Sequence, residues 1–318
     1  MLVLSAADIR AVCDIASLVP VIADAMRAVS AGEATLPIRS VMPLPGGNRF
    51  GMMAGRLARP DIYGIKLISL FPENPARGRS SHAGLMVVFD AETGLARACL
   101  DASVLTLLRT AAASAVATDA LARRDATRLA IIGTGEQAPA HIDAMRAVRE
   151  IRDIVVYGRT REKADAVARA CGGRAVGSLE DALSGAEIVC TVTAAHEPFL
   201  SPEMLAEGSH LNAVGGSVPA YRELQPECIA AWRTVTDYRP ALEAGAWDVM
   251  EARARGLIPG DREIPEIGEV LAGSAAGRRD PRERTLYRSL GIAAQDLAAA
   301  DFIVARAAAA GVGTDVPI

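Results

Sequence analysis

One segment, residues 128–148 (RLAIIGTGEQAPAHIDAMRAV), constrains the fold of this chain most strongly. It begins with a short apolar run, passes through a glycine-rich turn, and continues with apolar residues at helical spacing, Ile142, Met145 and Val148. Strand, turn and helix in this order are typical of dinucleotide-binding folds, in which the pyrophosphate lies at the helix N-terminus. We therefore predict a dinucleotide site. The alternative is a strand–helix turn that binds nothing, because a G-x-G-x-x-A pattern alone is weak.

Each small residue of this turn has a physical role in such a site. Gly133 can adopt the positive φ that the turn needs, and Gly135 has no Cβ to keep phosphates away from the backbone. Ala138 lets the helix pack close to the strand. Pro139 falls in the first helical turn, where its missing N–H costs no hydrogen bond.

The end of the next predicted strand, within residues 151–163, indicates which dinucleotide is bound. Folds of this kind place an acidic residue there for a ribose 2′-hydroxyl. This chain instead has Gly158, followed by Arg159, Thr160 and Arg161. Arginine forks onto phosphate oxygens, and a hydroxyl adds one more hydrogen bond. We therefore expect NADP(H) as the preferred cofactor and leave NAD(H) open. The alternative is that these arginines are only a solvated helix start.

Length, charge and cysteine usage limit the class of protein. A chain of 318 residues exceeds what one core usually organises, so we expect two domains. A net charge of −4 without a basic block excludes nucleic acid and anionic membranes as favoured partners. Asp8 and Arg10 interrupt the apolar run that a signal peptide would need. We also expect that no segment reaches the length of a membrane span. The five cysteines are scattered, so we expect reduced thiols and a soluble, cytoplasmic protein. The four histidines lack metal-ligand spacing, so we expect no metal.

Apolar periodicity predicts the order of the elements. About 120 residues precede the nucleotide-binding domain and have their own pattern of helices and strands. We expect a first helix over residues 6–32, interrupted near Pro20. Strands are expected at 39–44, 50–57, 64–71 and 83–90, the last in a hairpin with a turn at 90–94, and after the glycine turn at 186–192, 210–214 and 234–236. Further helices are expected at 104–122 and 296–310.

Lysine is rare in this chain. Only Lys66 and Lys163 occur among 34 lysines and arginines. Lys163 lies on a charged helix face and is best interpreted as solvated, whereas Lys66 alternates with Ile65 and Leu67 in a predicted strand. A buried ammonium near a substrate can bind a carboxylate or donate a proton, because burial lowers its pKa toward neutrality. The alternative is a lysine whose ammonium reaches water from an edge strand.

Six segments in order resemble the ornithine cyclodeaminase/mu-crystallin family. They are LPIRS (36–40), GIKLIS (64–69), LLRTAAASAVA (107–117), IIGTGEQA (131–138), HLNAVGGSVPAYREL (210–224) and LGIAAQD (290–296). The resemblance implies an α/β homodimer in which a doubly wound Rossmann domain, residues 118–294, is inserted in an α+β substrate-binding and dimerisation domain, residues 1–117 plus 295–318. It also implies a cyclodeaminase, an amino-acid dehydrogenase or an imine reductase; mu-crystallins in addition bind thyroid hormone.

The resemblance also implies roles for particular residues. Arg39 and Arg109 match the family's carboxylate-binding arginines, and Lys66 matches its active-site lysine. A guanidinium can bind the α-carboxylate of a substrate through two parallel hydrogen bonds, which suits these roles. From the residues alone, Arg39 could be a surface strand residue, whereas a cation near a helix N-terminus, such as Arg109, is disfavoured by the helix dipole. Together with the glycine turn, the resemblance predicts the cofactor-binding residues Thr110, Gly133, Thr134, Gly135, Glu136, Gln137, Arg159, Thr160, Arg161, Thr191, Val214, Ser289 and Gly291.

Ser217 departs from the cyclodeaminase pattern. Cyclodeaminases and several dehydrogenases of the family have an aspartate after the two small residues that follow NAV, whereas this chain reads NAVGGSV, close to the mu-crystallin form. A serine cannot act as a general base unaided, so ornithine cyclisation is disfavoured. Reduction of a preformed imine needs only a hydride at carbon and one proton at nitrogen, which Lys66 or a water held by Ser217 could relay.

We therefore predict an NADP(H)-dependent reductase of ketimines or cyclic imino 2-carboxylates, whose reverse reaction oxidises an amino acid. The substrate is a small amino or imino acid, and Lys66 and Ser217 are the catalytic candidates. A cyclodeaminase-type lyase with bound NAD is one alternative; an acidic residue at 158 or 217 would favour it. A non-catalytic, mu-crystallin-like binding protein is the other. Arg39, Lys66 and Arg109 argue against a passive binder, which need not keep three cations for one carboxylate.

Overall fold

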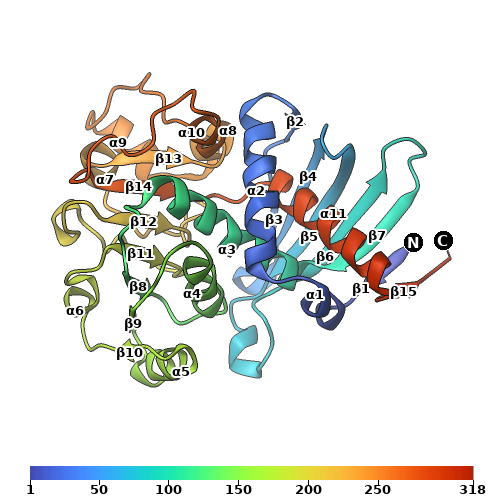
Figure 1. Cartoon of the computed structure of the whole chain (residues 1–318), viewed down its shortest axis with the longest axis horizontal. Helices are drawn as coiled ribbons and strands as arrows, with labels where there is room; N and C mark the ends of the chain where they lie inside the picture. Colours follow the sequence, from blue (N-terminus) through green and yellow to red (C-terminus); the bar gives the residue numbers. More distant parts are fainter. Residues whose placement is uncertain (318) are drawn as a thin grey trace. The chain divides into compact units, whose positions relative to one another are not determined.

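The computed structural model describes residues 1–317, which form two compact units (Figure 1). The outer unit consists of Met1–Thr110 and the C-terminal residues from Ile292 onward, and the inserted unit is Ala111–Gly291. The expected fold class is confirmed: a parallel doubly wound sheet is inserted in a domain built on a mixed sheet. The units divide at 110/111 and 291/292, where 117/118 and 294/295 were expected.

The outer unit is built on an eight-stranded sheet. Its strand order is β15-β1-β7-β6-β5-β4-β2, with β3 paired to β4. Only β1 and β7 pair in parallel; the other neighbours are antiparallel. The strands are β1 (Leu2–Leu4), β2 (Ala34–Thr35), β3 (Ser40–Pro43), β4 (Arg49–Leu57), β5 (Ile62–Leu70), β6 (His82–Asp90), β7 (Ala96–Asp101) and β15 (Thr314–Asp315). The predicted strands and hairpin between residues 39 and 101 are all present.

Helix α11 (Ala293–Ala310) lies against β4, β5 and β6 and packs on α2 (Ile15–Ser30) (Figure 1). Small residues allow this close approach. A Cβ added to Gly55 on β4 would lie 2.9 Å from the Cβ of Ala293. The sheet face under α11 is therefore tightly covered, and any polar side chain on it is removed from water.

The first helical region differs from the prediction. Two helices, α1 (Ala6–Val12) and α2, meet at residues 13–14, where the Asp14 carboxylate accepts the backbone N–H of Ser17 at 2.8 Å as an N-cap. Pro20 lies inside α2 and does not interrupt it. Its side chain is exposed, and so is Ala16, so the carbonyl that loses its helical partner can be hydrated.

The inserted unit contains a seven-stranded, entirely parallel sheet with the order β10-β9-β8-β11-β12-β14-β13. Its strands are β8 (Arg128–Ile132), β9 (Asp153–Tyr157), β10 (Arg174–Ala175), β11 (Ile188–Thr191), β12 (His210–Ala213), β13 (Arg233–Thr236) and β14 (Thr285–Arg288). Strand β14 was not predicted, because TLYR has neither a clear alternation nor a long apolar run. The chain order reverses between β8 and β11, where such sheets bind ligands at their carboxyl ends.

Helices cover the parallel sheet. They are α4 (Gln137–Val148), α5 (Arg161–Cys171), α6 (Leu179–Leu183), α7 (Glu227–Ala231), α8 (Arg239–Gly245), α9 (Trp247–Ala254) and α10 (Ile267–Ala272). The short 3-10 helices of the chain are η1 (Pro45–Gly47), η2 (Asn74–Arg77) and η3 (Pro202–Met204). Helix α3 (Ala102–Leu121) is long and apolar enough to cross a membrane, so the expectation that no segment reaches this length is wrong. Its apolar window is 78% buried inside the structure, as in a core helix.

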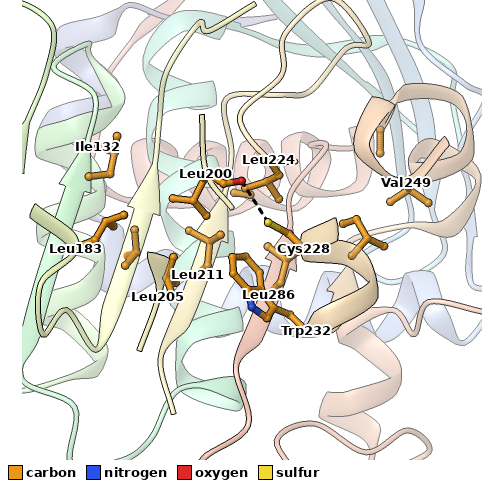
Figure 2. Packing of buried hydrophobic residues seen from close by; sticks show 14 of the residues in the cluster. Ile132, Leu183, Leu200, Leu205, Leu211, Leu224, Cys228, Trp232, Val249 and Leu286 are labelled. Carbon is orange, nitrogen blue, oxygen red and sulfur yellow. Dashed lines mark hydrogen bonds between the residues drawn. The ribbon is translucent and has the colours of Figure 1, made fainter. Parts of the chain in front are cut away.

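An apolar cluster of the inserted unit supports the loops at the carboxyl edge of the sheet. Figure 2 shows Leu200, Leu211, Leu224 and Trp232 in this cluster, with the Cys228 thiol donating to the Leu200 carbonyl at 3.3 Å. Each of these side chains is at most 3% exposed. The loops that leave the sheet here are consequently anchored on a dense core.

Candidate active site

Lys66 is buried on the covered face of the outer sheet. It lies on β5, an inner strand, opposite Met53 of β4 and Met86 of β6. Its Nζ donates to Asp296 of α11 at 2.8 Å, and the two side chains are 1% and 0% exposed. Lys66 is thus neither on an edge strand nor solvated, and the alternative considered from the sequence is wrong.

Two arginines add positive charge to this ion pair. Arg109 Nε lies 2.9 Å from Asp296 Oδ1, and Arg109 Nη1 donates to Gln295 Oε1 at 2.7 Å. Within residues 1–317, Arg109 Nε is buried without a well-aligned hydrogen-bond acceptor. Arg39 is half-buried and close enough to act on the charge of Lys66. Two cations therefore pair with one carboxylate, and Arg39 adds positive charge nearby, an arrangement that favours a further anion.

The charges and burial of this cluster bring the pKa of Lys66 close to neutral pH. Burial and the positive charge of Arg109 lower the pKa of Lys66 from its ordinary 10.5 to about 7, and Arg39 adds a smaller lowering effect. Attraction and hydrogen bonding by Asp296 oppose the change. An ammonium with a pKa close to 7 can release its proton at physiological pH, as a general acid must.

The glycine turn of the inserted unit has the geometry of an anion site. Gly133 has φ 126°, and a Cβ there would lie 2.7 Å from the Val192 carbonyl oxygen. Nothing lies within 4 Å of a Cβ built on Gly135, and Glu136 provides no side-chain cap to α4. These features fit a dinucleotide pyrophosphate, which the turn and the start of α4 would hold.

The end of β9 separates the predicted phosphate-binding residues into two kinds. Arg161 pairs with Asp165 at 3.1 Å and also donates to the Ala175 carbonyl, so its guanidinium is already engaged. Arg159 and Thr160 are exposed, and within residues 1–317 neither side chain makes a hydrogen bond or ion pair. Arg159 and Thr160 are therefore the side chains available to a ligand.

The remaining predicted cofactor residues of the inserted unit lie where β11, β12 and β14 end. The Val214 N–H donates to the Thr191 carbonyl at 3.0 Å, and the Ser289 N–H donates to the Ala213 carbonyl at 3.0 Å. Gly291 has φ 72°, and its N–H donates to Asp237 at 2.6 Å. Thr110 belongs to the outer unit, where it is buried in α3.

Thr191 makes a contact that the sequence did not predict. Its hydroxyl, which is fully buried, donates to Glu223 Oε2 at 2.8 Å. Burial raises the pKa of Glu223, while hydrogen bonds from Thr193 and Thr191 and the charge of Arg288 oppose this effect. Ser217 is half-buried in the loop that ends at this glutamate.

Sequence reasoning missed two buried carboxylates. Asp296 lies in the segment LGIAAQD, where an acid in the first turn of a largely apolar helix was an available signal. Glu223 lies six positions after Ser217 and was not considered as its neighbour. Within residues 1–317, no group of three or more His, Cys, Asp or Glu side chains is arranged to hold a metal ion.

Comparison with known proteins agrees with this geometry. The sequence pattern of the ornithine cyclodeaminase/mu-crystallin family matches residues 1–311. The chain belongs to this family. A Delta(1)-pyrroline-2-carboxylate reductase of Bacillus cereus (strain ATCC 10987 / NRS 248) is 34% identical over 321 residues, which cover 98% of each chain.

Two solved structures of the family superpose on almost the whole chain. The Thermococcus litoralis Delta(1)-pyrroline-2-carboxylate reductase, in complex with NADH and L-proline, has a TM-score of 0.95 and 30% identity, covering 99% of this chain and 100% of that one. An archaeal alanine dehydrogenase, a dimer with bound NAD, has a TM-score of 0.93 and 27% identity, covering 100% and 99%. Family members of this fold thus bind NAD(H).

Proposed function

We propose that this protein is an NADPH-dependent reductase of cyclic imino 2-carboxylates, with a pyrroline or piperideine 2-carboxylate as substrate. The observation that carries the proposal is the buried cluster of Lys66, Arg109 and Asp296, in a chain whose relatives over its full length include Delta(1)-pyrroline-2-carboxylate reductases. The reverse reaction would oxidise the corresponding amino acid.

The cationic cluster accounts for recognition of the substrate carboxylate. Arg109 is anchored by Gln295 through Nη1 and by Asp296 beside Nε, while Arg39 adds a second guanidinium. A guanidinium binds a carboxylate through parallel charge-assisted hydrogen bonds. An anionic substrate would also balance the excess positive charge of the buried cluster.

Lys66 supplies the proton of the reaction. When bound, a reduced nicotinamide supplies the hydride that adds to the imine carbon. Lys66 Nζ donates the proton that the imine nitrogen must receive, and Asp296 orients the ammonium through the 2.8 Å hydrogen bond. Ser217 holds a water or the product amine and does not act as a base, because a hydroxyl without a basic partner cannot remove protons at neutral pH.

The decisive test is an NADPH-oxidation assay with purified protein over cyclic imino 2-carboxylates and over 2-oxo acids mixed with amines. We expect turnover of the cyclic imino acids. A parallel incubation with L-ornithine and NAD⁺ should release neither proline nor ammonia. Robust proline formation would instead establish the cyclodeaminase alternative, and ligand binding without any NADPH oxidation would establish the binding-protein alternative.

Ser217→Asp tests why ornithine is not cyclised. A carboxylate at this position stabilises a protonated amine and can take part in proton transfer from the substrate nitrogen. We expect slower imine reduction and faster amino-acid oxidation by the variant. Unchanged rates in both directions would remove residue 217 from the chemistry.

The open face of the outer sheet supports a homodimer as the working form. Met52, Leu67 and Leu85 are opposite one another on β4, β5 and β6, on the face away from Lys66, and Leu85 is 50% exposed. Met42 of β3, on the same face, is 47% exposed. Apolar side chains gathered on one face are typical of association surfaces, and a second copy of this chain is the occupant we propose.

The five free cysteines support a cytoplasmic location.

A further inference from the structure

The loop that carries Ser217 leaves β12 after Ala213 and ends at Glu223; we call residues 214–223 the serine loop. Glu223 is 3% exposed, and its two carboxylate oxygens accept four hydrogen bonds. Oε1 accepts from the N–H and the hydroxyl of Thr193, both at 2.8 Å. Oε2 accepts from the Thr191 hydroxyl and from the Gly215 N–H, again both at 2.8 Å. One side chain thereby joins the chain after β11 to the start of the serine loop.

This contact pattern requires a carboxylate. Each oxygen of Glu223 faces one backbone N–H, from Thr193 or from Gly215, and a backbone N–H cannot rotate to become an acceptor. Glutamine at this position would turn its NH₂ toward one of these two N–H groups in either orientation. The isosteric amide must therefore break one side of the connection.

A second buried side chain holds the peptide group between Gly216 and Ser217. Arg288, at the end of β14, donates from Nη2 to the Gly216 carbonyl. Its Nε pairs with Asp248 of α9 at 2.8 Å, and both side chains are 3% exposed. Glu223 thus holds the N–H of Gly215 and Arg288 holds the carbonyl of Gly216, immediately before Ser217.

The two glycines fit this arrangement sterically. A Cβ on Gly215 would lie 2.0 Å from the Thr193 carbonyl oxygen and 2.4 Å from Glu223 Oε1. A Cβ on Gly216 would lie 2.8 Å from Arg288 Nη2. Glycine at both positions lets the backbone come within hydrogen-bond distance of the buried charges.

We propose that Glu223, Arg288 and Asp248 form a buried positioning unit that holds the Gly215–Gly216 turn and so fixes Ser217 at the carboxyl edge of the parallel sheet. None of the three is a catalytic residue. The effect on turnover rests on the proposed function, whereas the effect on the loop does not.

Hydrogen–deuterium exchange of the full chain tests the positioning unit independently of activity. In Glu223→Gln, peptides from the serine loop should exchange about tenfold faster or more, while peptides from β8 and α4 keep their protection. Gly215→Ala should give the same result, because it displaces the turn without removing a charge. The control is Glu227→Gln, which removes an exposed ion pair with Arg255 and should leave the loop unchanged.

Kinetics with the best imine found for the wild-type protein then test the consequence. A displacement of about 1 Å can cost about 100-fold, so we expect kcat of Glu223→Gln to fall by about 10- to 100-fold. KM and the Kd for NADPH should stay within about threefold, and Glu223→Asp should recover part of kcat because it keeps an acceptor for both N–H groups.

The outcomes separate the two proposals. Unchanged exchange in the serine loop, or wild-type kcat despite faster exchange, would overturn the positioning unit. Loss of one limb of the pH profile in Glu223→Gln would also overturn it, because Glu223 would then be the proton donor. If the wild-type protein reduces no imine, the proposed function fails while the exchange data still decide on the loop.

Discussion

At the residue scale, the proposed chemistry depends most on Lys66, whose side chain is 1% exposed and paired to one carboxylate. We expect Lys66→Met to retain the fold and cofactor binding and to lower kcat/KM by about two orders of magnitude or more, a typical loss for a positioned acid. Lys66→Arg should not restore activity, since a guanidinium does not release its proton near neutral pH. Steady-state kinetics of the two variants are the measurement. Normal kinetics in the methionine variant would make Lys66 a structural residue.

The pH dependence follows from the same lysine. Because its pKa in the folded protein is about 7, the protonated, donating form is dominant below pH 7 and is lost as pH rises above it. We therefore expect kcat/KM for imine reduction to be highest below pH 7 and to fall about tenfold per pH unit well above it. The residual activity of Lys66→Met should not show this fall above pH 7. If the fall persists in the variant, the group that titrates is not Lys66.

Our proposal assigns cofactor choice to Arg159 and its neighbours. We expect NADPH to be used at least about tenfold more efficiently than NADH, which requires only about 1.4 kcal/mol, less than a charge-assisted phosphate hydrogen bond can provide. Arg159→Ala should selectively raise KM for NADPH. Arg161→Ala is the matched control, because Arg161 is already paired with Asp165. Equal efficiency of the wild-type protein with both cofactors would contradict the preference.

We expect Gly158 and Thr134 to determine cofactor choice together. A Cβ at 158 would lie 2.5 Å from Thr134 Cγ2, so an acid at this position requires the Thr134 side chain to move. We expect Gly158→Asp alone to weaken binding of both cofactors, and Thr134→Ser with Gly158→Asp to bind NADH in preference to NADPH. Fluorescence titration gives the Kd values. A full switch by the single variant would show that the contact does not matter.

At the element scale, α4 and β12 bury two histidines within the inserted unit. Burial lowers the pKa of His141 to about 4 and that of His210 to about 3. Both are neutral when folded, whereas unfolded histidine takes up a proton below about pH 6.5. The free energy of unfolding should therefore fall by about 1.4 kcal/mol per pH unit for each histidine as pH drops from about 6.5 toward 4, with no contribution above pH 6.5.

Urea unfolding at pH 7, 6 and 5 measures this slope. His141→Gln should reduce it by about half in this range, because one of the two buried imidazoles is gone. The exposed His196 supplies the control, and His196→Gln should leave the slope unchanged. An unchanged slope in His141→Gln would assign the acid sensitivity to other groups.

At the scale of the whole molecule, the open sheet face predicts assembly. Light scattering should give about twice the chain mass of 33.2 kDa. Leu85→Glu places a charge at the centre of the proposed interface and should produce monomers. Leu95 is more exposed, 69%, but lies in the turn before β7, so Leu95→Glu should leave the dimer intact. A monomeric wild-type protein, or a dimeric Leu85→Glu, would exclude this face.

The sequence by itself determined what depends on local order. The glycine turn between β8 and α4, the alternating strands and the small-residue helix α3 are signals within one or two elements, because backbone conformation and burial of one face act over short separations. They predicted the fold class, and with the six family segments they predicted the function class and the importance of Lys66.

Only the tertiary structure decided which distant charges meet. Asp296 is 230 residues from Lys66 in the chain, and Glu223 reaches Thr191 across 32 residues; neither pairing leaves a periodic trace in the sequence. The place of β5 inside the sheet, and not at its edge, also depends on long-range strand pairing. Burial and the charges of distant neighbours set the pKa of Lys66, so the lowered pKa could be inferred only once α11 was seen to cover its strand.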